Sequence, residues 1–164
     1  MINATICFLR DGDLTLLLDR IPGKGDLHHG FYVPPGGKTK EGERGIDCIL
    51  REFEEETGLT LIEPRLRAIV TFYNKDRVLG DKKDPEDWLV EVYEAKEYTG
   101  ELKGESPKAR PMWINESDFK DKEMHEGDRR LIKFLYDEEK EGVFEVLVKY
   151  NGTRVERFES VRVA

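Results

Sequence analysis

Cysteine and surplus basic charge are both scarce in this chain, and each shortage argues against a class of protein. The two cysteines, Cys7 and Cys48, lie far apart and lack the spacing of a metal site. We therefore expect reduced thiols in a cytoplasm and no disulfide framework. The 35 acidic residues outnumber the 27 basic ones, so the formal net charge is −8. A nucleic-acid polymer is therefore not expected as a partner, because no basic surplus exists to meet its phosphates.

Long apolar runs, repeats and low-complexity tracts are missing as well. No run approaches the roughly 20 residues that span a bilayer, and the opening residues MINATICFLR show no signal-peptide pattern. We therefore expect a cytoplasmic chain with no membrane partner, acting as a monomer or a homodimer. The 164 residues suit a single domain over 1–164.

Acidic residues are concentrated in one short segment that has the pattern of a helix. Apolar residues recur there at i, i+3, i+4 and i+7, which predicts a helix with one face in a core. Gly58 is expected to stop this helix, and Asp47 is expected to pair with Arg51 four residues later. The apolar positions are Ile46, Ile49, Leu50 and Phe53.

Three glutamates of this helix, Glu52, Glu55 and Glu56, are expected to project from one side. Side chains three or four apart have Cβ atoms about 5–6 Å from each other, so their like charges repel. A cation would relieve that repulsion. Carboxylate oxygens are hard ligands, so Mg²⁺ or Mn²⁺ suits them better than Zn²⁺.

The spacing of these residues resembles the Nudix box at every fixed position. The match runs over residues 37–59 and is carried by Gly37, Glu43, Arg51-Glu52-Phe53, Glu55-Glu56 and Gly58-Leu59. The resemblance implies an α/β fold, an α/β/α sandwich with a mixed β-sheet. It also implies hydrolysis of phosphoric anhydrides, with a divalent metal that activates water and neutralises phosphate oxygens.

Roles for individual residues follow from the same resemblance. Metal would be held by the carboxylates of Glu52, Glu55 and Glu56, together with the carbonyl group of Gly36. The resemblance places Glu52, Glu55 and Arg51 in catalysis, with Glu52 as a candidate general base. Glu43 and Arg51 would orient the metal-binding carboxylates.

Strands are predicted on both sides of the acidic helix. The strongest hairpin signals are Asp11-Gly12-Asp13 and Asn151-Gly152. A second helix is predicted from an Asp128 cap to about Lys140, with Leu131, Ile132 and Leu135 buried. The predicted strands are Ile2–Arg10, Leu14–Arg20, Phe31–Val33, Leu66–Tyr73, Trp88–Ala95, Met112–Ile114, Val143–Tyr150 and Arg154–Val163.

Stretches outside the box resemble the MutT-like branch, which acts on oxidised purine nucleoside triphosphates such as 8-oxo-dGTP. They are residues 30–38, 110–114 and 124–128. By position, the resemblance implies that His125 stacks on the base and that Asp128 binds the purine edge. Four further substrate contacts are expected: Arg20 and Lys24 by charge, Tyr32 by stacking, and Lys38 beside the metal site.

The sequence thus predicts a Mg²⁺-dependent hydrolase that cleaves a nucleoside triphosphate to a monophosphate and pyrophosphate. Two alternatives stay open. One is an ADP-ribose or dinucleoside polyphosphate pyrophosphatase. The other is a nucleotide-sensing module without turnover, which the intact set of Glu52, Glu55 and Glu56 disfavours.

Overall fold

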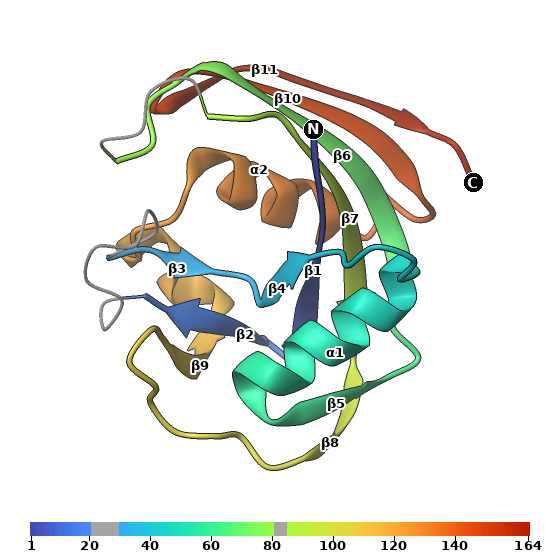
Figure 1. Ribbon diagram of the computed structural model, residues 1–164, viewed down its shortest axis with the longest axis vertical. Coiled ribbons are helices and arrows are strands. Elements are labelled where there is room, and N and C mark those ends of the chain that lie inside the picture. The colour runs from blue at the N-terminus through green and yellow to red at the C-terminus, as the bar shows by residue number, and fades with distance from the viewer. Residues whose placement is uncertain (21–29, 81–84) are drawn as a thin grey trace.

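A mixed sheet of nine strands forms the centre of the molecule in this computed structural model, which describes residues 1–20, 30–80 and 85–164 (Figure 1). Seven strands follow the order β11-β10-β6-β7-β1-β2-β3, while β4 pairs with β1 and β9 pairs with β2. Their bounds are β1 Ile2–Asp11, β2 Leu14–Asp19, β3 Tyr32–Val33, β4 Gly36–Lys38, β6 Arg65–Arg77, β7 Trp88–Ala95, β9 Arg110–Asn115, β10 Phe144–Gly152 and β11 Arg154–Arg162. A separate pair joins β5 (Leu59–Ile62) to β8 (Glu97–Gly100).

The sheet is mixed because parallel and antiparallel pairings alternate across it. β1 runs parallel to β7 and β10 runs parallel to β6, whereas β6 and β7 are antiparallel. The predicted mixed sheet is confirmed.

Each face of this sheet is covered by one helix. Along β1, Phe8 belongs to the core beneath α2 (Glu126–Leu135), while Cys7 and Leu9 belong to the core beneath α1 (Gly45–Thr57). This alternation follows from the period of two in a strand, and it places the helices in opposite layers. The predicted α/β/α arrangement is therefore confirmed (Figure 1).

Helix α1 forms where the apolar periodicity predicts it. Ile49 and Phe53 are fully buried, and Gly58 ends the helix in the left-handed region with φ 81°. The predicted pair between Asp47 and Arg51 is wrong. Asp47 instead accepts hydrogen bonds from Arg44, with 2.6 Å between Nε and Oδ2. Arg51 makes its contacts on another side of the helix.

Helix α2 is shorter than predicted and begins earlier. It ends at Leu135, and His125 occupies the N-cap position, so Asp128 lies within the first turn and does not cap the helix. The buried face of Leu131, Ile132 and Leu135 is confirmed. Three carbonyl groups, that of Leu135 at the end of α2 and those of Lys140 and Gly142 beyond it, accept hydrogen bonds from the buried Arg67 of β6.

The other predicted strands are found, most of them with shifted ends. The sequence analysis missed the short strands β4, β5 and β8 and the 3₁₀-helix η1 (Glu116–Asp121). These elements have three to six residues, too few for a hydrophobic period to show. No helix among the described residues is long and apolar enough to cross a membrane.

Candidate active site

Glu56 lies at the inner end of the acidic cluster, where α1 faces β4. Its Oε1 accepts a hydrogen bond of 2.8 Å from the backbone N–H of Gly36. Burial raises the pKa of Glu56 to about 7, and the charges of Glu52 and Glu55 act in the same direction. Arg20 and the Gly36 hydrogen bond oppose that rise. A carboxylate in this position favours a cation beside it.

Glu52 lies against the backbone of the glycine pair that precedes the box. A Cβ atom on Gly37 would lie 2.5 Å from Oε2 and 2.7 Å from Oε1 of Glu52, so a side chain at position 37 would displace this carboxylate. The glycine pair therefore lies directly against the carboxylates of Glu52 and Glu56.

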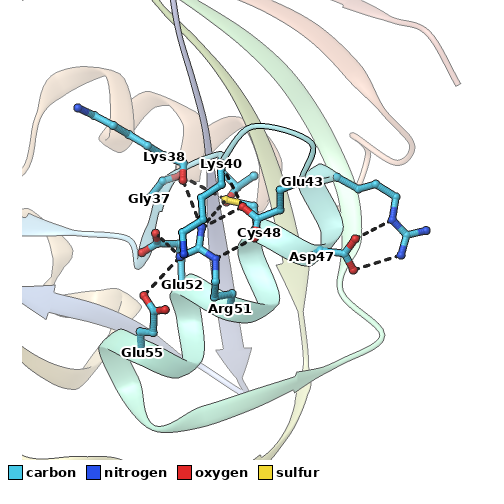
Figure 2. A network of polar contacts seen from close by, with 11 residues as sticks. Gly37, Lys38, Lys40, Glu43, Asp47, Cys48, Arg51, Glu52 and Glu55 are labelled. Atoms are coloured by element: carbon cyan, nitrogen blue, oxygen red, sulfur yellow. Dashed lines mark hydrogen bonds and ion pairs between the residues drawn. The ribbon is translucent and has the colours of Figure 1, made fainter.

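Arg51 holds the outer side of the cluster together (Figure 2). Its Nε and Nη2 donate to Oε2 and Oε1 of Glu43 at 2.8 and 2.9 Å, while Nη1 donates to Glu52 at 2.8 Å and to Glu55 at 3.4 Å. The hydrogen bonds from Arg51 lower the pKa of Glu43 to about 2. Glu43 is thus a permanently charged anchor that fixes the guanidinium group between two of the glutamates.

The donor set suits a magnesium ion in kind, because it consists of oxygen atoms next to a crevice that only glycine can line. In the described part of the chain, however, no group of three or more His, Cys, Asp or Glu side chains is arranged to hold an ion. Arg51 donates hydrogen bonds to Glu52 and Glu55, and the N–H of Gly36 donates one to Glu56. Glu52, Glu55 and Glu56 are the residues that would hold the metal.

A cavity of about 240 Å³ opens from this cluster into the sheet. Gly36, Gly37 and Glu56 line its acidic end, and Arg20 also reaches it. Its walls are mostly apolar and come from β1, β3, β6 and β7; they include Ile6, Val33, Phe72, Trp88 and Val90. Such a cavity suits a flat aromatic group attached to a charged one.

Asp128 marks the other end of this cavity. Among the described residues it makes no hydrogen bond or ion pair, although burial raises its pKa to about 6 against the opposing charge of Arg77. The guanidinium group of Arg77 lies 3.9 Å from the ring centroid of Tyr150 and donates a long bond of 3.4 Å to Asn74. The far end of the cavity therefore presents an acceptor and several donors.

The other predicted substrate residues have different positions. His125 lines the cavity, and its ring stacks on Phe31 with the centroids 4.2 Å apart. Lys38 is exposed on β4, with Nζ 5.8 Å from the Trp88 ring centroid. Tyr32 packs on the core beneath α2 and is not among the described residues that line the cavity. Lys24 lies outside the described residues.

Sequence reasoning missed three residues of the site. Trp88, Arg77 and Tyr150 carried no signal, because an aromatic residue in a strand and an arginine at a strand end are ordinary. Only the packing of β6 against β10 brings the latter two together beside Asp128.

A second cleft of about 1090 Å³ adjoins the first and shares Arg77, Leu79, His125 and Tyr150 with it. It runs between α2 and the β10–β11 hairpin. Five basic and three acidic side chains line it, together with aromatic ones such as Phe134 and Phe158.

The family model for the NUDIX domain matches residues 2–135. The chain belongs to the Nudix family. It is 34% identical over 133 residues to the uncharacterized Nudix hydrolase YvcI of Bacillus subtilis (strain 168), a match that covers 81% of this chain and 78% of YvcI. Nudix membership confirms the predicted enzyme class, a hydrolase for a nucleotide-type substrate in a family that typically depends on a divalent metal.

Solved MutT structures share this Nudix fold. The mutator MutT protein from Bacillus halodurans superposes with a TM-score of 0.79 at 24% identity, covering 98% of this chain and 97% of its own. The MutT NUDIX hydrolase from Burkholderia pseudomallei gives a TM-score of 0.65 at 22% identity, over 80% of this chain and 95% of its own. The likeness to the first structure includes the C-terminal hairpin, which lies beyond the segment that the family model matches.

Proposed function

We propose that this Nudix hydrolase cleaves a purine nucleoside triphosphate to a monophosphate and pyrophosphate, with oxidised purines such as 8-oxo-dGTP as substrates. One observation carries the proposal: a single cavity is lined by Glu56 and the glycine pair and also by Asp128, which makes no hydrogen bond or ion pair with the described residues. The triphosphate would lie beside Glu56 and the base beside Asp128.

At the phosphate end, Glu52, Glu55 and Glu56 would hold Mg²⁺. The metal would supply Lewis-acid activation of the anhydride and lower the pKa of an attacking water. Arg51 orients Glu52 and Glu55 through its bonds to both, and Glu43 orients Arg51. Arg20, which lines the cavity, adds positive charge near the phosphates, while Glu52 is the candidate base that removes the proton from water.

At the base end, an ionised Asp128 would accept hydrogen bonds from the donor groups of a purine edge. Phe72 and Trp88 provide apolar walls for the ring. A hydrogen bond to a charged group contributes about 1.5–3 kcal/mol, so the preference for the correct edge should be at least about tenfold.

A substrate panel tests the proposal directly. kcat/KM is measured with Mg²⁺ for dGTP, 8-oxo-dGTP, 2-hydroxy-dATP, ADP-ribose and diadenosine polyphosphates, with pyrophosphate and phosphate release followed separately. Pyrophosphate release from a triphosphate supports the hydrolase reaction. Equal kcat/KM for 8-oxo-dGTP and dGTP would reject the oxidised-purine part alone, and binding without any turnover would instead support a nucleotide sensor.

A larger nucleotide, ADP-ribose or a dinucleoside polyphosphate, is the second candidate. The observation in its favour is the adjoining cleft of about 1090 Å³, which shares four residues with the nucleotide cavity and carries aromatic and basic side chains. Preferred hydrolysis of these compounds in the same panel would select it.

A further inference from the structure

The C-terminal hairpin contains one side chain that reaches the nucleotide cavity, Tyr150 of β10. Residues 136–164 lie outside the segment matched by the NUDIX domain model, so the family match assigns nothing to this tyrosine. Its side chain is only 2% exposed and is among the largest fully packed ones in the molecule. A polar hydroxyl group so deeply buried requires a partner.

That partner is the backbone of helix α2 at its first turn. The N–H of Gly127 donates a hydrogen bond of 2.7 Å to the Tyr150 hydroxyl oxygen. The first N–H groups of a helix have no partner within the helix, so Tyr150 satisfies one of them from across the cavity. A Cβ atom on Gly127 would lie 2.6 Å from this oxygen and 3.1 Å from Phe72, so the approach requires glycine. The next residue along the helix is Asp128.

The ring of Tyr150 fixes a second group of the cavity. The guanidinium carbon of Arg77 lies 3.9 Å from the ring centroid, in the range of a cation–π contact. Arg77 is the charged residue that opposes the rise in the pKa of Asp128. Tyr150 therefore contacts both the helix turn that carries the acid and the arginine that faces it.

The pairing of the strands is irregular at this very residue. On one side of β10, Lys149 pairs with Tyr73 and Asn151 with Asp76, so β6 has one extra residue opposite Tyr150. On the other side, Lys149 pairs with Arg157 and Tyr150 with Val155, so β11 also has one extra residue. Bulges are common beside active sites, where they redirect a side chain. Two of them flank Tyr150.

We infer that Tyr150 is a positioning residue for nucleotide binding, through which the C-terminal hairpin holds Asp128 and Arg77 at the base end of the cavity. The inference rests on the proposed function, because it assigns that end to the base. Tyr150 takes no part in the hydrolysis, so its removal should change KM and leave kcat nearly unchanged.

Two variants separate the hydroxyl group from the ring. Tyr150→Phe removes the bond to Gly127 and keeps the contact with Arg77, and we expect KM for the preferred nucleoside triphosphate to rise about 2- to 10-fold, with kcat within about twofold. Tyr150→Leu also removes the ring, so Arg77 loses its support. The acid limb of kcat/KM should then move to higher pH, because the positive charge of Arg77, which lowers the pKa of Asp128, is no longer held in place by the ring.

Tyr73→Phe is the matched control. Tyr73 lies on the adjacent strand β6, is 40% exposed and lines neither cavity among the described residues, so kcat, KM and the pH profile should stay at wild-type values. Melting temperatures of all variants are measured in parallel. Unchanged KM in Tyr150→Phe would overturn the inference, and so would a fall in kcat and melting temperature without a rise in KM.

Measuring ligand affinity directly tests the positioning role of Tyr150 independently of the proposed hydrolysis. The affinity of the product-like ligands dGMP and 8-oxo-dGMP is measured by calorimetry in the wild type and in Tyr150→Phe. If the wild type hydrolyses no triphosphate, the proposed function fails, while a loss of monophosphate affinity in the variant still supports the positioning role. Equal affinity in both proteins would refute that role whether or not turnover is seen.

Discussion

Arg51 and Glu43 are joined by two hydrogen bonds, Nε to Oε2 at 2.8 Å and Nη2 to Oε1 at 2.9 Å, with 22% and 14% of their side chains exposed. This two-pronged contact fixes the plane of the guanidinium group, whose remaining nitrogen reaches Glu52 and Glu55. Glu43 comes from the loop before α1 and Arg51 from its middle, so the pair also ties the loop to the helix.

We expect Arg51→Lys and Glu43→Gln each to lower kcat about 10- to 100-fold, because residues that orient metal ligands have effects of this size. A lysine cannot make the two parallel bonds. The combined variant should lose little more than either single one, since both act through the same contact. Steady-state kinetics with saturating Mg²⁺ measures this.

The exposed pair of Arg44 and Asp47 provides the control for that experiment. It has the same two-pronged contact, at 2.6 and 3.2 Å, but its side chains are 79% and 45% exposed, and it lies away from the glutamates. Arg44→Lys should leave kcat and KM within about twofold of the wild type. A large fall in kcat in Arg44→Lys would show that any change to a charged pair of α1 lowers activity, whatever the position of the pair.

We expect Glu56→Gln to reduce Mg²⁺-dependent turnover by at least about 10- to 100-fold, because it removes a carboxylate that we propose as a metal ligand. Without metal the same variant should melt at a higher temperature than the wild type, because it relieves the repulsion of Glu56 by Glu52 and Glu55. Glu54→Gln is the control on the opposite, exposed side of the same helix. Loss of both activity and stability in Glu56→Gln would point to a structural role.

Nucleotide affinity should depend on pH through Asp128, whose pKa is raised to about 6 by burial. Above this pH the carboxylate is ionised and accepts hydrogen bonds, so KM should be low; below it the acid is protonated and KM should rise. In Asp128→Asn, KM should be high and flat between pH 5 and 8, roughly, with kcat little changed. A wild-type profile retained in the variant would exclude Asp128 from base binding.

The free energy of unfolding should also depend on pH through Asp128, and the direction of this dependence follows from its pKa. The pKa of Asp128 is about 6 in the folded chain and 3.8 ordinarily, so the folded state binds more protons than the unfolded state between these values. The free energy of unfolding therefore falls as pH rises through this window. Asp128→Asn should be more stable than the wild type by about 1–2 kcal/mol at pH 7.5, after allowance for solvent, and the gain should vanish below pH ~4. Urea melts at three pH values measure it.

Arg67→Met should destabilise the fold without changing the chemistry of the site. Arg67 is 6% exposed, pairs with the buried Glu94 and donates to three carbonyl groups after α2. Its removal should lower the free energy of unfolding by about 3 kcal/mol, because these groups lose their partner. Arg65→Met is the control: Arg65 also pairs with Glu94 but is 67% exposed, and its loss should have little effect in the same denaturant melts.

The linear pattern alone determined the acidic end of the cavity, where we propose that the metal binds. Helix α1 repeats its apolar residues every three to four positions, so the sequence settles both its buried face and the side on which Glu52, Glu55 and Glu56 lie. Gly37, Glu43 and Arg51 precede or share that helix, and their contacts are local. The partner of Asp47 was predicted wrongly because residues three and four positions away compete for it on an exposed surface. The free energies of such pairs differ little.

Only the tertiary structure decided the part of the cavity that we propose binds the base. Arg77, Asp128 and Tyr150 come from β6, α2 and β10, and nothing in their spacing predicts that they meet. Their meeting depends on the parallel pairing of β10 with β6 and on the two bulges opposite Tyr150, since a shift of one residue would turn that side chain to the other face of the sheet. Strand pairing between distant segments is fixed by the packing of the whole sheet and not by the residues of any one strand.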